Sequence, residues 1–329
     1  MKCLIIRFSS IGDIVLTTPV IRCLKQQVEG VEVHYLTKKS FRGILASNPY
    51  IDKLHLLEDD WDGMIKELQA EKFDYVIDLH HNLRTLRIKR ALKKVPSFSF
   101  NKLNIQKWLL TALKINRMPP VHIVDRCMDT VKSLGVVNDG QGLDYFIPAK
   151  DEVRAEDLPM SHHGGYIGVV IGAALNTKKL PVEKLKELCA QIQHPVVLLG
   201  GPEDKAEGDE IATTDNVKIY NACGKFNLNE SASLVRNAKL IVSHDTGLMH
   251  IAAAFKKPVV SVWGNTVPEF GMTPYYGKYE VPNQIFEVKG LSCRPCSKIG
   301  YKKCPKGHFK CMMQQEIPAI ANAAITLKK

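Results

Sequence analysis

The chain has 329 residues, of which 45% are hydrophobic and 24% are charged, and its formal net charge at pH 7 is +11. This length exceeds what one hydrophobic core usually covers, so two domains are expected, and the composition is that of a globular protein. No stretch approaches the roughly 18 uninterrupted apolar residues of a membrane-spanning helix, and Arg7 and Asp13 interrupt the first apolar run, unlike a secretory signal. We therefore expect a cytoplasmic protein.

The N-terminal half alternates short apolar runs with helical patterns, which is typical of a parallel sheet built from βαβ units. We predict strands at 2–7, 32–36, 53–57 and 75–78, and helices at 13–27 and 61–71. A polar stretch at 148–165 interrupts this alternation, and we place the domain junction there. The predicted domains are 1–155, which binds the acceptor, and 156–329, which binds a nucleotide sugar.

A basic segment lies between Asp78 and Asp125, where the chain has no acidic residue. Ten cations occur there: Arg84, Arg87, Lys89, Arg90, Lys93, Lys94, Lys102, Lys107, Lys114 and Arg117. Interleaved side chains such as Phe98, Phe100 and Trp108 favour amphipathic helices over a disordered tail. The segment indicates a polyanionic partner, which could be anionic lipid, a phosphorylated substrate or nucleic acid; the alternative is a solvated surface without a partner.

The C-terminal half repeats the βαβ pattern. We predict strands at 166–172, 195–200, 217–221, 240–243 and 258–264, with the clearest helix at 182–193. Two Rossmann-like units facing one another across a cleft are therefore expected, with the ligand site beyond the carboxyl ends of the strands. The last helix could pack back on the N-terminal domain.

Three strand-end loops of this half carry groups that suit a nucleotide diphosphate. After the first strand, "GAALNTKKLP" places Ala173, Ala174 and Lys178 before a helix, where a cation and backbone amides can hold phosphate. After the second, "LGGPED" offers Gly201 for close backbone approach and Glu203 as an acceptor for a ribose or a base.

The third loop reads "SHDTGLMHIAAA". Here Asp245 and Thr246 can cap the next helix, Gly247 admits a ligand to the amides, and His250 follows one turn later. Each feature also has a purely structural reading: a cap, a turn glycine or an exposed lysine. The sequence contains neither G-x-G-x-x-G after the first strand nor G-x-x-x-x-G-K-[ST], which argues against a dinucleotide dehydrogenase and a P-loop NTPase.

Taken in order, "FSSIGDIVLTTPVI", "GAALNTKKLP", "LGGPED" and "SHDTGLMHIAAAFKKPVVSVWGNTVP" resemble the motifs of glycosyltransferase family 9, the ADP-heptose:lipopolysaccharide heptosyltransferases. The resemblance implies a GT-B fold, inverting transfer and no catalytic metal or other cofactor. It implies that Asp13 is the general base, that Lys178 binds the diphosphate and that Glu203 contacts the nucleoside. It also assigns donor binding to the loop and helix start with Asp245, Thr246, Gly247 and His250.

The chain departs from that family at Ala173 and Ala174, where heptosyltransferases often have hydroxyl residues. Side-chain contacts to the phosphates are lost there, so the identity of the donor stays open. A second reading of Asp13 is also open, because a first-turn acid stabilises a helix start without any catalytic role.

Acceptor contacts are expected from two places in the N-terminal half. One is the opening motif, with Ser10 and Gly12, and the other is "DLHHNLRT", with Asp78, Asn82 and Arg84. An anionic glycolipid, such as a phosphorylated or Kdo-bearing lipid core, would agree with the basic segment. This pairing of charges predicts peripheral contact with the inner membrane.

Four of the nine cysteines lie close together in "CRPCSKIGYKKCPKGHFKC": Cys293, Cys296, Cys304 and Cys311. In a reducing compartment this spacing indicates a structural Zn²⁺ or a redox-labile pair, and His308 could replace one thiolate. No part in catalysis is assigned to the cluster.

We predict an inverting transferase that moves a sugar, heptose by the resemblance, from an ADP-linked donor to a lipopolysaccharide core acceptor. The alternatives are a nucleotide-sugar epimerase, another GT-B enzyme with a different donor, and a polyanion-binding protein. Nucleic acid is not expected as a partner, since no aromatic RNP motif is present.

Overall fold

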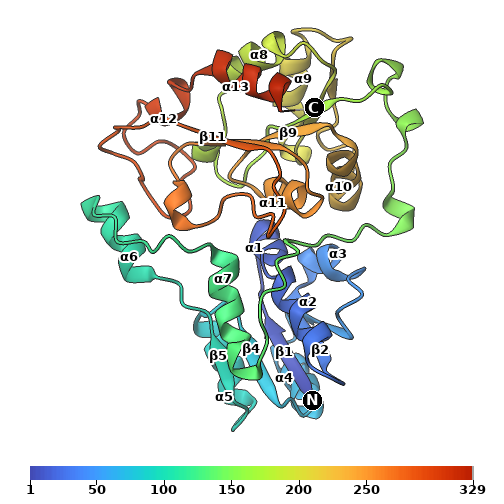
Figure 1. Ribbon diagram of the computed structural model, residues 1–329, viewed down its shortest axis with the longest axis vertical. Coiled ribbons are helices and arrows are strands. Elements are labelled where there is room, and N and C mark those ends of the chain that lie inside the picture. Colours follow the sequence, from blue (N-terminus) through green and yellow to red (C-terminus); the bar gives the residue numbers. More distant parts are fainter. Residues whose placement is uncertain (328–329) are drawn as a thin grey trace. The chain divides into compact units, whose positions relative to one another are not determined.

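The computed structural model describes residues 1–327, which form two compact units (Figure 1). The first unit contains residues 1–102, 121–146 and 277–279, and the second contains 103–120, 147–276 and 280–327. The backbone crosses between the two units at five places, and the crossing at 146/147 is the one that corresponds to the boundary predicted at 155/156. The sequence also did not anticipate that residues 103–120 belong to the second unit.

The first unit is built on a five-stranded parallel sheet in the order β3-β2-β1-β4-β5. Its strands are β1 (Lys2–Ile6), β2 (Glu32–Lys38), β3 (Lys53–Leu57), β4 (Tyr75–Asp78) and β5 (Ser97–Ser99). Its helices are α1 (Ile11–Val15), α2 (Thr18–Gln27), α3 (Arg42–Leu45), α4 (Trp61–Ala70), α5 (Leu83–Ala91) and α7 (Ile123–Met128). Apolar side chains of β1, β2 and β4 pack against α4 and α5 to form its core.

The predicted helix at 13–27 is two helices, α1 and α2. Pro19, near the start of α2, has no N–H, so it cannot donate to the carbonyl of Val15 as a continuous helix requires. The hydroxyl of Thr18 donates to that carbonyl instead, at 2.8 Å. The chain therefore starts a new helix and keeps the carbonyl satisfied.

The second unit contains a six-stranded parallel sheet in the order β11-β10-β9-β6-β7-β8, the order of a doubly wound nucleotide-binding fold. Its strands are β6 (Ile167–Val170), β7 (Val196–Leu199), β8 (Ile219–Asn221), β9 (Leu240–His244), β10 (Val259–Trp263) and β11 (Asn283–Glu287). Its helices are α6 (Asn104–Trp108), α8 (Val182–Gln191), α9 (Lys205–Ala212), α10 (Leu228–Asn237), α11 (Gly247–Ala254), α12 (Lys310–Met313) and α13 (Ile317–Thr326).

The last helix packs inside the second unit. Ile317, Ile320 and Ala324 of α13 are buried in the same apolar core as Leu185 and Leu188 of α8. The apolar face of this helix is thus covered within the second unit, and its packing on the N-terminal domain stays a prediction. Within residues 1–327, no helix combines the length and the apolarity needed to cross a bilayer.

Candidate functional site

The predicted donor loops follow β6, β7 and β9, which are neighbours in the order β9-β6-β7. Because the strands are parallel, the three loops emerge at the same edge of the sheet. The first ends in a short 3₁₀ turn, η7 (Asn176–Lys178), and the third leads into α11. The topology of the second unit therefore brings these three loops to one edge of the sheet, as the sequence predicted.

Lys178 and Asp245, from two of these loops, form an ion pair. Nζ of Lys178 lies 2.6 Å from Oδ2 of Asp245 and 3.2 Å from its carbonyl oxygen. The hydroxyl of Thr266 donates to the same Oδ2 at 3.0 Å. Asp245 is therefore a positioning group for the lysine, and the alternative that it merely caps α11 is not what the structure shows. Thr266 was not identified from the sequence, because only the fold brings it to this carboxylate.

The neighbouring Lys179 points into the protein. Its Nζ lies 2.7 Å from Oδ1 of Asp204 and 2.7 Å from Oε2 of Glu207, and Asp204 is almost fully buried. Burial opposes the charge of Lys179, but bonds to the two carboxylates outweigh it and raise its pKa above the usual value. Of the two adjacent lysines, Lys178 is thus the one available to a ligand.

The start of α11 presents backbone amides. Thr246 is its N-cap residue, but its side chain makes no capping hydrogen bond; its hydroxyl lies 3.3 Å from that of Ser243. Gly247 is the first helical residue, and His250, one turn later, is buried. The first-turn N–H groups of a helix are orphan donors that favour an anion.

The second donor loop, which follows β7, has an exposed carboxylate. Glu203 is exposed, and Gly201 donates its N–H to Asp204 at 2.9 Å. A Cβ on Gly201 would lie 2.3 Å from Oε2 of Glu203, so the glycine leaves room for that carboxylate. Ala173 is half-buried and Ala174 is exposed. These four residues belong to loops that leave the same edge of the sheet as the loop with Lys178, and nothing in the geometry assigns them a specific ligand contact.

His244, the last residue of β9, also belongs to this region and was not singled out from the sequence. Its Nε2 accepts a hydrogen bond of 2.9 Å from the N–H of Leu180, directly after the two lysines. Complete burial and the nearby Lys179 charge lower its pKa to about 3. His244 is therefore neutral and fixes the loop that carries Lys178; its position beside the Asp-Thr-Gly string was the only available signal.

Asp13 lies in the first unit, in the first turn of α1 after β1. Its Oδ1 is 2.7 Å from Nη2 of Arg7, and its Oδ2 accepts hydrogen bonds from the backbone N–H and the hydroxyl of Ser10, at 3.2 and 2.9 Å. Burial opposes its ionisation, but Arg7 and Ser10 outweigh burial and lower its pKa below the usual 3.8. The side chain is 21% exposed, so it is neither sealed in the core nor free in solvent.

The residues predicted to contact the acceptor have different environments. Ser10 is the exposed N-cap residue of α1, Gly12 is buried in that helix, and Arg84 is exposed on α5. Asn82 caps α5 by accepting the N–H of Thr85 at 3.0 Å. It is partly exposed, so capping and ligand contact are compatible.

Asp78 requires a correction. Its side chain has no exposed surface, and Oδ1 accepts the backbone N–H groups of His80 and His81 at 3.1 and 2.6 Å. Its Oδ2 lies 3.0 Å from Nζ of Lys89. An aspartate at a strand end readily holds the following loop in this way. A direct acceptor contact by Asp78 is therefore not available in this arrangement.

No three of the four cysteines of the predicted zinc site have their sulfur atoms within 4.8 Å of one another. Within residues 1–327, the only set of three or more His, Cys, Asp or Glu ligand atoms within 4.8 Å of one another involves none of these cysteines. Cys293 has its sulfur 3.8 Å from Nε2 of His308, while the thiol of Cys296 donates to the carbonyl of Cys293. The metal site at these cysteines therefore stays a prediction, and no role in the transfer reaction is derived from it.

Part of the basic segment is used within the protein. Lys89 pairs with Asp78, the guanidinium of Arg87 lies 4.7 Å from the centre of the Trp61 ring, and Lys114 donates to the carbonyl of Pro295 at 2.6 Å. The helices predicted here are α5 and α6, and α6 continues into a π-helical turn, η2 (Leu109–Leu113).

The comparisons with known proteins agree with this arrangement. The model of glycosyltransferase family 9 (heptosyltransferase) matches residues 61–303. Lipopolysaccharide heptosyltransferase 3 of Escherichia coli is 28% identical over 275 residues, which cover 78% of this chain and 80% of the relative. Lipopolysaccharide heptosyltransferase 1 of Pseudomonas aeruginosa is 24% identical over 318 residues, with 91% and 86% covered.

Solved structures share the fold. A glycosyltransferase of family 9 from Veillonella parvula has a TM-score of 0.78 at 22% identity, covering 99% of this chain and 97% of its own. The ADP-heptose heptosyltransferase II of E. coli has a TM-score of 0.71 at 17% identity, with 100% and 98% covered. The predicted α/β fold of GT-B type is thereby confirmed. With its matching family model, its paired parallel sheets and its strand-end loops, the chain belongs to glycosyltransferase family 9 and is an enzyme of the glycosyltransferase class.

Proposed function

We propose that this glycosyltransferase moves a heptose from an ADP-linked donor to a lipopolysaccharide core acceptor, with inversion at the anomeric carbon. The observation that carries the proposal is the ion pair of Lys178 and Asp245 beside the uncapped start of α11. The curated relatives that support it are named lipopolysaccharide heptosyltransferases.

The donor diphosphate binds at this pair. A lysine ammonium has three N–H donors, and Asp245 accepts two of them through Oδ2 and its carbonyl oxygen. The third can reach a phosphate oxygen. As the sugar leaves, negative charge grows on the departing diphosphate, and the ammonium together with the α11 amides stabilises it more in the transition state than in the ground state. These groups supply the charge that a metal ion supplies in other transferases.

Asp13 accepts the proton of the attacking hydroxyl. Its lowered pKa keeps it ionised at neutral pH, and Arg7 and Ser10 fix the direction of its carboxylate. Each carboxylate oxygen has two lone pairs, so these contacts leave sites for the incoming proton. General bases of this kind contribute about 10²- to 10⁴-fold in rate. The family match begins at residue 61, so the role of Asp13 rests on its own geometry and on the opening motif.

The decisive experiment is an assay of the purified protein with ADP-heptose and a heptose-free Kdo-bearing lipid core. ADP release together with mass gain of the lipid by one heptose supports the proposal. A parallel thermal-shift panel with ADP-, GDP-, UDP- and CMP-linked sugars identifies the donor nucleotide. Conversion of the nucleotide sugar without change in the lipid would instead indicate an epimerase, and no response to the ADP-linked sugar would contradict the proposal.

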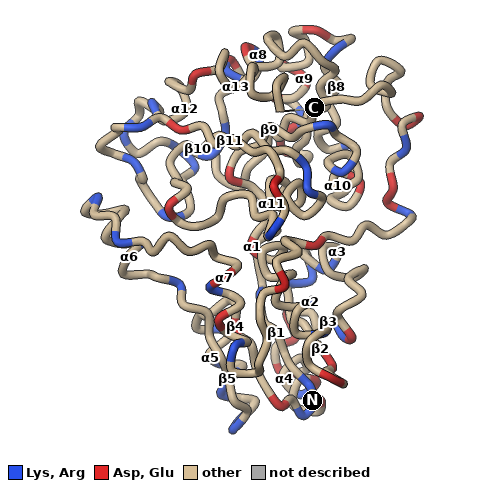
Figure 2. Tube along the Cα trace, viewed as in Figure 1, with Lys and Arg blue, Asp and Glu red and all other residues tan. Residues whose placement is uncertain are grey.

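We further propose that the segment 103–120 contacts the membrane that holds the acceptor. It exposes Ile105, Trp108, Leu113 and Ile115 by 72, 57, 52 and 45%. Lys and Arg positions lie along the same segment (Figure 2). Exposed apolar side chains beside cations are typical of a peripheral contact with anionic lipid.

The membrane contact is tested by flotation with vesicles that contain anionic lipid. Wild-type protein is expected to float, and binding should weaken when Trp108 and Ile105 are replaced by serine. Val217→Ser is the control, because Val217 is an exposed apolar residue in another part of the second unit, and this variant should float as the wild type does. Equal flotation of the Trp108→Ser/Ile105→Ser variant and the wild type, or binding only to a polynucleotide, would contradict this part of the proposal.

A further inference from the structure

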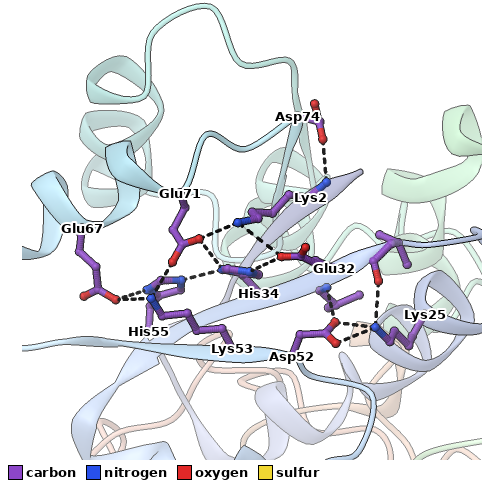
Figure 3. Close-up of polar contacts among 12 residues, drawn as sticks. Lys2, Lys25, Glu32, His34, Asp52, Lys53, His55, Glu67, Glu71 and Asp74 are labelled. Atoms are coloured by element: carbon purple, nitrogen blue, oxygen red, sulfur yellow. Dashed lines mark hydrogen bonds and ion pairs between the residues drawn. The ribbon is translucent and has the colours of Figure 1, made fainter.

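Two buried histidines face each other in the first unit. They lie within β2 and β3, and not at the carboxyl ends of the strands, where Asp13 follows β1. His34 is the third residue of β2 and His55 the third of β3, and they are 2% and 1% exposed. Nδ1 of His34 lies 2.9 Å from Nε2 of His55. The ring centres are 5.1 Å apart and the planes differ by 28°. The rings therefore meet edge to edge, with one nitrogen of each turned toward the other (Figure 3).

A carboxylate lies at the outer nitrogen of each ring. Nδ1 of His55 is 2.9 Å from Oε1 of Glu67, and Nε2 of His34 is 3.6 Å from Oε2 of Glu32. A carboxylate can only accept, so Glu67 favours the His55 tautomer with the proton on Nδ1 and leaves Nε2 as an acceptor. Glu32 is too far from His34 for a hydrogen bond, so Nδ1 of His34 can carry a proton and donate it to Nε2 of His55. A metal ion that binds both inner nitrogens takes the place of this proton.

A third ligand atom is close to them. Oε2 of Glu71, the residue that ends α4, lies 4.0 Å from Nδ1 of His34. The ligand atoms of His34, His55 and Glu71 are all within 4.8 Å of one another, and they are the only such set in residues 1–327. The ring of Phe73 borders both imidazoles, with centroids 5.2 and 6.1 Å away, and shields them on one side.

We propose that His34, His55 and Glu71 bind a divalent transition metal of the zinc type. Nδ1 of His34, Nε2 of His55 and the Glu71 carboxylate are the protein ligands, and water completes the tetrahedron, as in other two-histidine, one-glutamate sites. Glu67 holds the His55 ring in the ligating tautomer from outside. The site joins β2, β3 and the end of α4, so its role is to stabilise the first unit, independently of the transfer reaction.

One further observation bears on the affinity. Glu71 is held by Lys2 and Lys53, whose Nζ atoms lie 2.8 and 2.6 Å from its two oxygens. Those ammonium groups compete with a dication. Their side chains are 25 and 46% exposed, so both lysines can turn into solvent when a dication takes their place.

The test is a titration of the full-length protein with Co²⁺ after removal of metals by a chelator. Nitrogen and oxygen ligands give cobalt d–d bands without the sulfur-to-cobalt charge-transfer band that thiolates produce. We expect one equivalent of this nitrogen/oxygen type, so the signal is separable from any binding by the cysteines. Zn²⁺ should displace the cobalt and raise the Tm of the wild type.

Three variants sharpen the test. Glu71→Gln removes a surface ligand without opening the core and should weaken cobalt binding at least tenfold. Glu67→Gln removes the outer partner of His55 and should weaken binding about 10- to 100-fold. Glu58→Gln is the matched control, because Glu58 is an exposed glutamate that pairs only weakly with Lys39, at 3.3 Å, outside the cluster; it should bind as the wild type does.

His55→Phe should abolish binding, and if that variant does not fold, the two glutamate variants still decide the question. A cobalt spectrum of thiolate type alone would overturn the proposal. So would equal affinities of the wild type and Glu71→Gln, or an equal rise of their Tm values with Zn²⁺.

Discussion

Arg7 and Asp13 form an ion pair of 2.7 Å across the turn between β1 and α1. Arg7 also donates to the carbonyl oxygens of Ser9 and Leu79, at 2.8 and 2.6 Å. One guanidinium thus joins the Asp13 carboxylate to the loop after β4. The position and the charge state of the proposed base therefore depend on a residue that the sequence analysis noted only as an interruption of an apolar run.

The first prediction concerns pH. Because Arg7 helps to lower the pKa of Asp13 below 3.8, the active carboxylate form persists down to that pH and is lost only below it. Arg7→Gln removes the stabilising charge but leaves the burial that raises the pKa. The acidic limb of the kcat/KM profile should therefore move to higher pH, measured from about pH 4 to 8.

Arg42→Ala is the control for this experiment, since Arg42 is an exposed arginine of the same unit. It should leave the profile unchanged. An acidic limb at the same pH in Arg7→Gln and wild type would show that Asp13 is not the group that titrates.

The second prediction separates catalysis from binding. Asp13→Asn removes the proton acceptor, keeps the size of the side chain and changes no residue of the donor loops, so turnover should fall about 10²- to 10⁴-fold. The affinity for ADP-heptose, measured by calorimetry, should stay within a factor of about two. A parallel loss of donor affinity would contradict the assigned role.

The third prediction distinguishes two adjacent lysines. Lys178→Ala should lower kcat/KM by about 10²-fold or more, because Lys178 stabilises the leaving diphosphate. It should cost less stability than Lys179→Ala, because Asp245 keeps its hydrogen bond from Thr266. Lys179→Ala leaves Asp204 buried without its cation and should cost about 3 kcal/mol of unfolding free energy in a urea titration. The reverse pattern would mean that the ligand-binding lysine has been misidentified.

The fourth prediction follows from His244. Its pKa is about 3 in the folded protein and 6.5 ordinarily, so between these values the unfolded chain binds a proton that the folded one does not. Stability should therefore fall as the pH is lowered through this window, by about 1.4 kcal/mol per pH unit for this one group.

His244→Gln keeps an acceptor for the Leu180 N–H and removes the titration, so its stability should depend less steeply on pH. His308→Gln, at an exposed histidine, serves as the control. Identical slopes for His244→Gln and wild type would exclude this contribution.

Strand positions could be read from the sequence because buried parallel strands are short apolar runs bounded by polar residues. The strands at 53–57 and 75–78 were predicted with their observed bounds. The edge strand β5, with the sequence Ser-Phe-Ser, lacks such a run and was not predicted. The break between α1 and α2 was missed because the apolar spacing continues through Pro19, although its missing N–H marks the end of a helix.

Side-chain pairing could not be predicted in the same way. The loop with Asp245 was recognisable, but its partners Lys178 and Thr266 are distant in the sequence and meet only through the order of the strands. Asp78 has the residue type and the strand-end position that are typical of a ligand contact. The sequence alone could not show that its carboxylate accepts two backbone N–H groups of the following loop. His34 and His55 were overlooked because they are 21 residues apart in the sequence and meet only through the pairing of β2 with β3.

The pairing of Lys178 with Asp245 has a consequence for inhibitors. The charge of the Lys178 ammonium is already balanced by Asp245 in the absence of substrate, so small cellular anions such as phosphate or chloride bind weakly here. Negative charge alone is therefore not enough for a competitive inhibitor. It has to accept both the third N–H of Lys178 and the backbone N–H of Gly247. Neutral mimics that donate to Asp245 and accept from the helix start are therefore a reasonable starting point for design.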